Sequence, residues 1–358
     1  MKINKKLSRV VLASAVLIIC FFLVSSIVSA VPAQSVSPSG RYAYVANSGA
    51  ADPDNIVSVV DTATNVVTAT VKVGTTPAAI AVSSDGAKAY VANFGSNNVS
   101  VINTTTNTVT SAVPVGSQPE GVAISPDRTK VYVANSLNSN VSVIDTATNK
   151  VIVTVDVGEY PVGVAVSPDG TKLYVINSNF NVPSNSTVTV IDTVTNNVAA
   201  TIKVGNSPRG VAVNPTGTKV YVASGSFEDY FDYVPGTVYV IDTAVNNVTA
   251  TVKVGNLPTG VVVNPTGTRV YVTNSLDSDN VSVIDTVTNK VIATVKVGIT
   301  PVAIAVSPDG KKVYVANKYS NNVSVIDTET NKVIATVNVG DGPVAIAVSP
   351  DGKKGLCG

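Results

Sequence analysis

The stretch Lys311–Gly340 reads KKVYVANKYSNNVSVIDTETNKVIATVNVG, and most of it recurs six more times along the chain. A tetrapeptide, Tyr-Val-Ala-Asn or a close variant, marks each copy. Its tyrosines are Tyr44, Tyr90, Tyr132, Tyr174, Tyr221, Tyr271 and Tyr314. Their spacing of 42 to 50 residues predicts an array of one repeated supersecondary unit. Seven such units account for nearly the whole chain after its leader.

Each copy contains four short runs rich in Val, Ile, Tyr and Thr, which are typical of β-strands. In the copy that begins at Pro301, the runs start PVAIAV, KKVYVAN, NVSVID and KVIATV. Turn-forming residues separate them, as in Ser307-Pro-Asp-Gly310 and Asp327-Thr-Glu-Thr-Asn331. No stretch after the leader has the apolar periodicity of a helix. The chain is therefore predicted to be all-β.

Near-continuous apolar runs such as Val302–Val306 predict strands that are buried on both faces. Blades packed face to face around an axis bury both faces, so we predict a seven-bladed β-propeller of four-stranded antiparallel blades. A parallel β-helix would not contain two tight turns per repeat, and separate sandwich domains would need about 100 residues each. A spare strand at Pro343–Ser349 is predicted to pair with Tyr42–Asn47, complete the first blade and close the ring.

Residues 1–30 have the pattern of a signal peptide. A basic segment precedes the mostly apolar run Val10–Val24, and Val28-Ser-Ala30 suits cleavage. We expect export and an extracellular or cell-surface protein with one domain, residues 31–358. If the leader stays uncleaved, it is long enough to act as a membrane anchor. Cys357 would be the only cysteine of the mature chain, so no internal disulfide is expected.

Charge and composition exclude several functions. The 24 basic and 23 acidic residues form no clustered basic face, so no nucleic-acid partner is expected. The chain has no histidine, and we expect neither a metal site nor a cofactor. Asp52 and Asp54 lack the spacing of a calcium loop. An aspartate recurs at one turn of each copy, where a structural role is more probable than a catalytic one: Asp145, Asp192, Asp242, Asp285 and Asp327.

Seven Asn-x-Ser/Thr sequons are candidates for glycosylation after export. They are Asn98, Asn103, Asn140, Asn185, Asn247, Asn280 and Asn322. Four of these, Asn98, Asn140, Asn280 and Asn322, occupy the same place in the repeat. Copying the repeat would copy the sequon, so a structural origin and selection for glycans both stay open.

The motifs Tyr-Val-Ala-Asn, Ser-Pro-Asp-Gly and Val-Ile-Asp-Thr recur in fixed order. In this the chain resembles the YVTN repeat β-propellers of cell-surface proteins, notably surface-layer proteins of methanogenic archaea. The resemblance covers about residues 36–352 and implies a surface-layer propeller. The copy at Tyr221 departs from the pattern, because Ser224 replaces the asparagine.

Three long insertions, Ser48–Asn55, Ser178–Thr187 and Gly225–Gly236, all join second and third strands. We therefore expect them at one end of the ring, which we call the loop face. Aromatic and acidic side chains concentrate in the connections at this end, and aromatic side chains in loops suit binding. The predicted binding residues are Phe94, Tyr160, Phe180, Phe227, Glu228, Asp229, Tyr230, Phe231, Asp232, Tyr233 and Tyr319. The same aromatic side chains could instead cap the blades.

Together these features predict a non-enzymatic cell-surface or surface-layer protein with a structural, adhesive or interaction role. Other surface proteins, glycans or further copies of the chain are the expected partners. The alternative is a propeller enzyme, lactonase-like or lyase-like, with a site at the central channel. The innermost strands disfavour this alternative, because they offer only Ala, Gly, Val, Ile and Ser in the ranges Ala78–Ser83, Val122–Ser125, Val162–Ser167 and Val302–Ser307.

Overall fold

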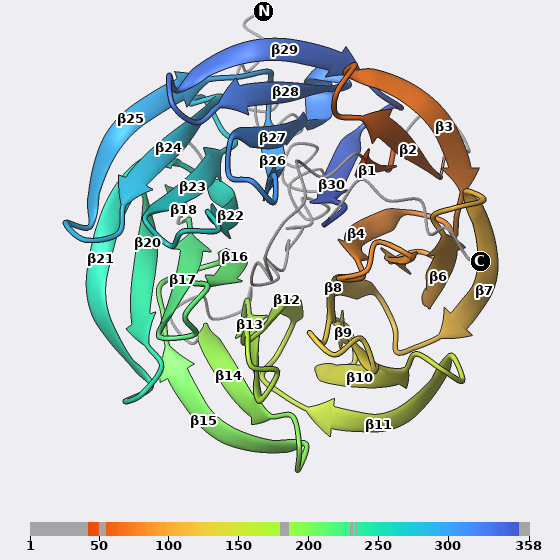
Figure 1. The fold of residues 1–358 in the computed structure, drawn as a ribbon. Coiled ribbons are helices and arrows are strands. Elements are labelled where there is room, and N and C mark those ends of the chain that lie inside the picture. The colour runs from red at the N-terminus through yellow and green to blue at the C-terminus, as the bar shows by residue number, and fades with distance from the viewer. Residues whose placement is uncertain are drawn as a thin grey trace, which may run out of the picture.

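A computed structural model describes residues 42–49, 55–179, 186–225 and 235–350, together with the backbone of 227–229 and 232–233. Seven four-stranded antiparallel sheets form a ring around one axis (Figure 1). The predicted seven-bladed propeller is therefore confirmed. Among the described residues, the only helix is the short 3-10 helix η2 (Lys318–Ser320). Within these described ranges, no helix is both long enough and apolar enough to span a membrane.

We number the blades in chain order. Blade 1 contains β1 (Tyr42–Asn47), β2 (Ile56–Asp61), β3 (Val66–Lys72) and β30 (Pro343–Val348). Blade 2 contains β4 (Pro77–Val82), β5 (Lys88–Asn93), β6 (Asn98–Asn103) and β7 (Thr108–Pro114). Blade 3 contains β8 (Pro119–Ile124), β9 (Lys130–Asn135), β10 (Asn140–Asp145) and β11 (Lys150–Asp156). Blade 4 contains β12 (Pro161–Val166), β13 (Lys172–Asn177), β14 (Thr187–Asp192) and β15 (Asn197–Lys203).

Blade 5 contains β16 (Pro208–Val213), β17 (Lys219–Ser224), β20 (Pro235–Asp242) and β21 (Asn247–Asn256). Blade 6 contains β22 (Pro258–Val263), β23 (Arg269–Asn274), β24 (Asn280–Asp285) and β25 (Lys290–Lys296). Blade 7 contains β26 (Pro301–Val306), β27 (Lys312–Asn317), β28 (Asn322–Asp327) and β29 (Lys332–Asn338). The innermost strands are β30, β4, β8, β12, β16, β22 and β26, as Figure 1 shows.

The last strand closes the ring as predicted. β30 pairs antiparallel with β1, with Tyr44 opposite Ala347. Beyond the strand end, the backbone N–H of Ser349 donates to the carbonyl oxygen of Tyr42 at 2.8 Å. Blade 1 thus takes three strands from one end of the chain and one from the other, which leaves no unpaired inner edge there.

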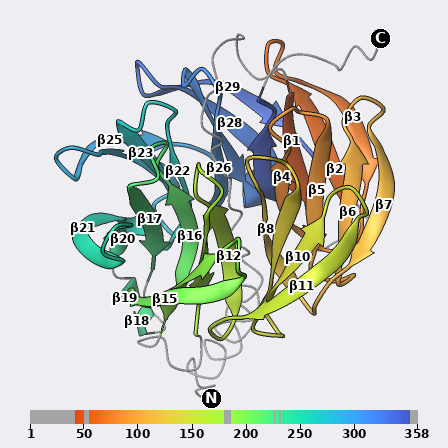
Figure 2. The same ribbon diagram turned by 60° about the horizontal axis from the view of Figure 1, so that its bottom comes forward.

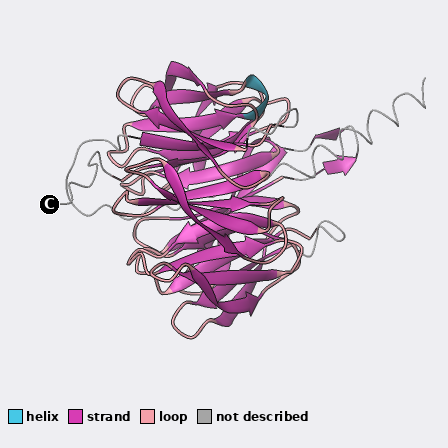
Figure 3. Ribbon diagram, turned by 90° about the vertical axis from the view of Figure 1, so that its right-hand side faces the viewer, coloured by secondary structure: helices cyan, strands magenta, loops and turns pink. Residues whose placement is uncertain are grey.

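The insertion in blade 5 forms a small hairpin of its own. β18 (Phe227–Asp229) pairs antiparallel with β19 (Asp232–Tyr233), between β17 and β20. Figures 2 and 3 show this hairpin projecting from one end of the ring, the loop face. The sequence pattern had not predicted strands at this place.

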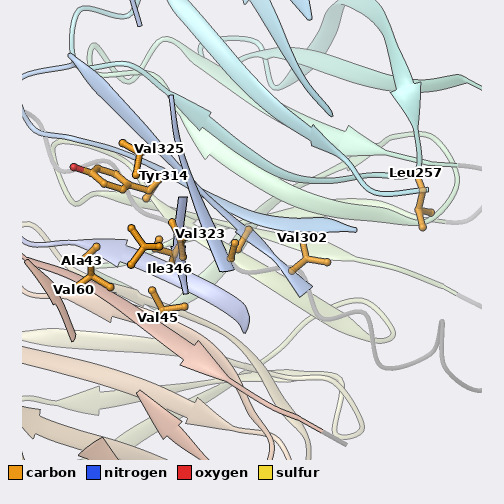
Figure 4. Close-up of a cluster of buried hydrophobic side chains, with 13 residues drawn as sticks. Ala43, Val45, Val60, Leu257, Val302, Tyr314, Val323, Val325 and Ile346 are labelled. Carbon is orange, nitrogen blue, oxygen red and sulfur yellow. The ribbon is translucent and has the colours of Figure 1, made fainter. Parts of the chain in front are cut away.

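The hydrophobic core lies between neighbouring blades. Figure 4 shows Tyr314 and Val325 of blade 7 close to Ala43 and Val45 of blade 1, and all four are almost completely buried. Burial raises the pKa of Tyr314 to about 12, against the effect of a hydrogen bond with Thr62 of blade 1. The tyrosines of the repeated tetrapeptide therefore serve blade-to-blade packing.

The recurring aspartates have the predicted turn role. In the β28–β29 turn, Oδ1 of Asp327 accepts from the backbone N–H of Thr330 at 2.8 Å and from its hydroxyl at 2.7 Å. These bonds lower the pKa of Asp327. Asn331 ends the turn in the left-handed conformation, with φ of 53°. A polar side chain that accepts two local donors fixes the turn without any catalytic function.

The tetrapeptide asparagine joins strands within a blade. In blade 2, Nδ2 of Asn93 donates to Oδ1 of Asn98 at 2.7 Å and to the hydroxyl of Ser100 at 2.9 Å. A Cβ built on Gly74, in the connection that leads into this blade, would lie 2.7 Å from Cγ of Asn93. Glycine is required there because the connection passes directly over the amide.

Blade 5 replaces this arrangement with another. Ser224 occupies the asparagine position, and Tyr239 of β20 occupies the position of the partner serine. A Cβ built on Gly205, the equivalent connection glycine, would lie 2.1 Å from the hydroxyl oxygen of Tyr239. The tyrosine ring therefore fills the space that an asparagine side chain fills in the other blades.

Candidate functional site

Each innermost strand begins with a proline at the loop-face end of the axis, and the next residue differs from blade to blade. These second-position residues are Val344, Ala78, Glu120, Val162, Arg209, Thr259 and Val302 in blades 1 to 7. All seven are at most 9% exposed. Four are apolar, whereas Glu120 on β8 and Arg209 on β16 carry opposite charges.

These charged residues correct the expectation that the innermost strands contain only small, apolar and serine residues. The run assigned to blade 3 started at Val122, two residues too late, and the inner strand of blade 5 was not considered. Aligning the residues that follow the seven connection prolines would have revealed both charges.

Glycine at the third position lets the innermost strands approach one another. A Cβ on Gly121 would lie 3.0 Å from Cα of Gly163 in the next blade. A Cβ on Gly210 would lie 2.3 Å from the carbonyl oxygen of Thr259. The backbone is therefore packed tightly around the axis where the charged residues stand.

Glu120 is buried, and burial raises the pKa of its carboxyl group to about 7, against a hydrogen bond with Ser136 and the positive charge of Arg209. Water stabilises a carboxylate far better than the protein interior does, so desolvation favours the protonated form. A carboxyl group with a pKa near neutrality can both donate and accept a proton under physiological conditions.

Arg209 is 7% exposed and lies two blades from Glu120 around the ring. A guanidinium group stays protonated even when it is buried, and its planar set of donors matches a carboxylate. Both residues stand second in their innermost strands at the loop-face end of the axis, and the positive charge of Arg209 acts to lower the pKa of Glu120. This region therefore combines a fixed positive charge with a group that titrates near pH 7.

A serine directly follows the tetrapeptide asparagine in four blades, and those of blades 3, 4 and 6 are buried: Ser136, Ser178 and Ser275, whereas Ser48 of blade 1 is partly exposed. The hydroxyl of Ser136 donates to the carbonyl oxygen of Gln118 at 3.0 Å. The hydroxyl of Ser275 lies 2.8 Å from that of Thr259 and donates to the carbonyl oxygen of Pro301 at 2.6 Å. The hydroxyl of Ser178 is buried and has no hydrogen-bond partner.

We call these residues of blades 3 to 6 the polar arc: Glu120, Ser136, Ser178, Arg209, Thr259 and Ser275. The second positions of the other three blades carry Ala78, Val302 and Val344, which are apolar. The ring of copied blades is thus chemically asymmetric at its axis.

The predicted aromatic binding residues that the structure describes lie on different blades, and their binding role stays a prediction. Phe94 follows β5 of blade 2, Tyr160 precedes β12 of blade 4, and Tyr319 lies in η2 of blade 7. Tyr319 is 53% exposed, and the ammonium group of Lys318 lies 5.9 Å from its ring centroid.

The remaining predicted binding residues belong to the blade 5 and blade 4 insertions. The hairpin contains Phe227, Glu228, Asp229, Asp232 and Tyr233, whose backbone is described. Phe180, Tyr230 and Phe231 lie outside the described residues.

The sequon asparagines have structural partners. Asn98, Asn140, Asn280 and Asn322 each accept a hydrogen bond, at 2.7 or 2.8 Å, from the tetrapeptide asparagine of their blade. This bond accounts for the recurrence of the sequon. Asn103 and Asn247 lie at the β6–β7 and β20–β21 turns, and Asn185 lies outside the described residues. Glycosylation at these sites stays a prediction.

Two family profiles match parts of the chain. The profile of the YNCE-like β-propeller matches residues 66–182, and the profile of the cytochrome D1 heme domain matches residues 233–346. Each match covers less than half of the chain, and together they support membership among the β-propellers. A comparison with curated proteins found no match.

Two solved structures are similar to the whole ring. A chain of Kuenenia stuttgartiensis hydrazine synthase is 25% identical, with a TM-score of 0.71, over 78% of this chain and 92% of that one. A functionally unknown protein from Desulfotomaculum acetoxidans DSM 771 is 19% identical, with a TM-score of 0.72, over 87% of this chain and 100% of that one. The second likeness shows the fold alone.

These comparisons overturn the predicted main function. The matches include a heme domain and an enzyme, and they contradict a non-enzymatic surface-layer module. The YVTN-like repeat predicted the propeller architecture correctly. The residues that recur between its copies are explained by blade packing and turn formation. The alternative, an enzyme with a site at the axis, agrees better with the comparisons and with the polar arc.

The haem that one profile implies does not fit the donor set. Haem iron is held by axial donors such as His, Cys, Met or Tyr. The chain has no histidine, and Met1, Cys20 and Cys357 lie outside the described residues. The polar arc offers carboxyl, guanidinium and hydroxyl groups but no imidazole, thiolate or thioether. Tetrapeptide tyrosines such as Tyr132 are buried between blades, where burial raises the pKa to about 12 and disfavours the tyrosinate that iron prefers.

The described residues also contain no group of three or more His, Cys, Asp or Glu side chains that could hold a metal ion. The carboxyl, guanidinium and hydroxyl groups of the polar arc are suited to acid–base chemistry and anion binding.

Proposed function

We propose that this chain is a propeller enzyme whose site is the polar arc at the loop-face end of the axis, where it performs acid–base chemistry on a small carboxylate substrate. Two comparisons support the enzymatic class. The likeness to hydrazine synthase extends over most of both chains, and the second family profile describes a heme domain. The choice of a carboxylate substrate comes from Arg209 and Glu120.

The observation that carries the proposal is the pair of opposite charges in a ring of equivalent positions that other blades fill with Ala or Val. Burying an acid and a guanidinium group costs several kcal/mol per ion before their attraction is counted, about as much as a small domain's stability. Four blades show that the fold accepts apolar residues here. A ligand that needs both groups gives a reason for retaining them.

The two side chains have distinct roles. Arg209 binds the substrate carboxylate through two parallel N–H donors, which also orients the molecule. Glu120, when ionised, removes a proton from the carbon next to that carboxylate. In a lyase-like elimination, the C–H electron pair forms the new double bond, and the leaving group departs with its own bonding pair. Glu120 then carries the proton and can return it to the leaving group.

In a lactonase-like reaction the same groups act differently. Glu120 takes a proton from the water that attacks the carbonyl carbon, and Arg209 stabilises the negative charge that develops on the carbonyl oxygen. When the ring C–O bond breaks with its electron pair on the ring oxygen, Glu120 returns the proton to that oxygen. Both reactions need one titrating carboxyl group and one fixed cation. Neither needs a haem, and none is included in the proposal.

Ligand binding and turnover test the proposal together. Thermal unfolding and calorimetry with a panel of short carboxylates and lactones should identify ligands of the wild type, and NMR should follow their conversion. We expect Arg209→Met to abolish binding and Glu120→Gln, which keeps the size of the side chain, to retain binding but lose turnover by at least about 100-fold. If both variants bind and convert the panel like the wild type, the axis is not the site.

A haem-binding measurement is the second part of this experiment. Haem added to the purified protein should produce no protein-dependent shift of its Soret absorption band, because the polar arc lacks axial donors. A stable shift that Arg209→Met leaves unchanged would locate a haem site elsewhere and remove the support that the donor set gives to this proposal.

A further inference from the structure

We propose that the hydroxyl of Ser178 is a third substrate-binding group of the polar arc, and that the substrate is a 2-hydroxy or 2-oxo carboxylic acid. This inference rests on the function proposed above and adds the class of substrate. It comes from one buried hydroxyl group that the fold leaves without a partner.

The equivalent serines of two other blades show what this position normally does. In blade 6, the hydroxyl of Ser275 bonds with Thr259, the second-position residue of its own inner strand, at 2.8 Å. In blade 3, Ser136 acts to lower the pKa of Glu120, which occupies the same second position, and its hydroxyl donates to the carbonyl oxygen of Gln118 at 3.0 Å. The serine after the tetrapeptide thus lies beside the second-position side chain of its own innermost strand.

In blade 4 this partner is missing. The second-position residue there is Val162, which has no polar side-chain atom. Ser178 is 1% exposed, and its hydroxyl oxygen has no hydrogen-bond partner. Its backbone N–H donates to the carbonyl oxygen of Tyr160 at 2.9 Å, so the side-chain hydroxyl is the group that lacks a hydrogen-bond partner. A buried hydroxyl without a partner is costly, and a ligand oxygen would remove that cost.

The position of blade 4 determines which ligand oxygen this is. Blade 4 lies between blade 3, which carries Glu120, and blade 5, which carries Arg209. A carboxylate bound to Arg209 brings its 2-carbon toward blade 4 as the molecule extends toward Glu120. An oxygen on that carbon is the polar atom nearest to the carboxylate. A serine hydroxyl can donate to a carbonyl or accept from a hydroxyl, so 2-oxo and 2-hydroxy acids both fit.

Matched pairs of acids test this directly. Calorimetry of the full chain should show that lactate and pyruvate bind about tenfold more tightly than propionate, which lacks the 2-oxygen; one hydrogen bond accounts for a difference of this size. In Ser178→Ala, the affinities for the three acids should become equal, with propionate unchanged. The melting temperature should stay the same or rise, because the variant removes a buried hydroxyl that has no partner.

Ser324→Ala in blade 7 is the control, because this variant lies outside the polar arc and removes a buried hydroxyl that accepts from Nδ2 of Asn317 at 2.9 Å. It should lower the melting temperature and keep the tenfold preference. Equal binding of lactate and propionate by the wild type, with both abolished in Arg209→Met, overturns this inference and leaves the proposed function intact. A preference that persists in Ser178→Ala overturns the role of Ser178. Binding of none of the three acids to the wild type overturns the substrate class.

Discussion

The exchange in blade 5 makes a sharp prediction about coupling between two residues. Ser224 and Tyr239 stand where six other blades have asparagine and a serine or threonine. In blade 3, for comparison, Nδ2 of Asn135 donates to the hydroxyl of Ser142 at 2.9 Å. Restoring this pair in blade 5 requires two substitutions, Ser224→Asn and Tyr239→Ser. Each alone should be harmful, and the two together should be nearly neutral.

The magnitudes follow from the space beside the connection glycine. A Cβ on Gly205 would lie only 2.1 Å from the Tyr239 hydroxyl oxygen, so the ring already fills this region. Tyr239→Ser empties it and should cost about 2 kcal/mol, less than a full aromatic deletion because Tyr239 is half-buried. Ser224→Asn adds atoms to the filled region and should cost about 1–3 kcal/mol. The double variant should differ from wild type by less than about 1 kcal/mol, which gives a coupling of at least about 2 kcal/mol.

Equilibrium urea denaturation of the four proteins measures this coupling. Tyr319→Ser serves as the control, because that tyrosine is 53% exposed and its loss should cost less than about 1 kcal/mol. If the double variant loses the sum of the two single losses, the residues are independent. The account of Tyr239 as a substitute for the missing asparagine would then be wrong.

Further predictions concern the axis, a connection, the closing strand and the leader. Because burial raises the pKa of Glu120 to about 7, above its ordinary value of 4.5, the protein binds an extra proton when folded. The wild type should therefore lose stability relative to Glu120→Gln as pH rises from about 4.5 to 7, by on the order of 3 kcal/mol; parallel urea curves would disprove the burial of an ionisable group. Thr76, β-branched with φ of 52°, is strained, so Thr76→Gly should raise stability by about 0.5–1 kcal/mol, and an unchanged urea midpoint would count against strain. Deleting residues 343–349 should cause aggregation or a large fall in melting temperature, whereas melting like the full chain would mean that β30 does not close the ring. N-terminal sequencing of exported protein should find a start near Val31, and an intact Met1 on membrane-bound protein would establish an anchor instead.

The sequence predicted the architecture because the determinants of a blade are local. Strand-forming runs, the Asp327-type turn and the left-handed Asn331 are all visible within a few residues of one another. Closure was also predictable, because Pro343–Ser349 is a surplus first strand with an obvious vacancy beside β1. The hairpin of β18 and β19 was missed, since its aromatic and acidic residues have no counterpart in other copies.

The site was harder to predict because it is assembled across blades. Glu120 and Arg209 come from strands that are far apart in sequence, and each stands in a run that otherwise reads as an apolar strand. The missing partner of Ser178 depends on Val162, which only the register of blade 4 identifies. The aromatic side chains of the loop face, such as Phe94 of blade 2 and Tyr319 of blade 7, were visible in the sequence, and their role in binding stays a prediction.

Some residues that differ from the repeat are compensated by other residues of the chain, and others are not. At Ser224 the missing asparagine is compensated within the blade, since Tyr239 fills the same space, and no ligand is needed to explain the change. At the axis, Glu120 and Arg209 replace apolar residues, and burial still holds the carboxyl pKa near 7 despite the positive charge of Arg209. Ser178 is buried without a partner while its counterpart Ser275 has two. Interactions inside the chain thus explain the first departure completely, but they leave Ser178 without a partner and the carboxyl pKa of Glu120 raised, which is a cost in free energy. A bound molecule that meets all three groups would account for that cost, and this is why the axis, and not the tetrapeptide repeat, is the place to look for activity.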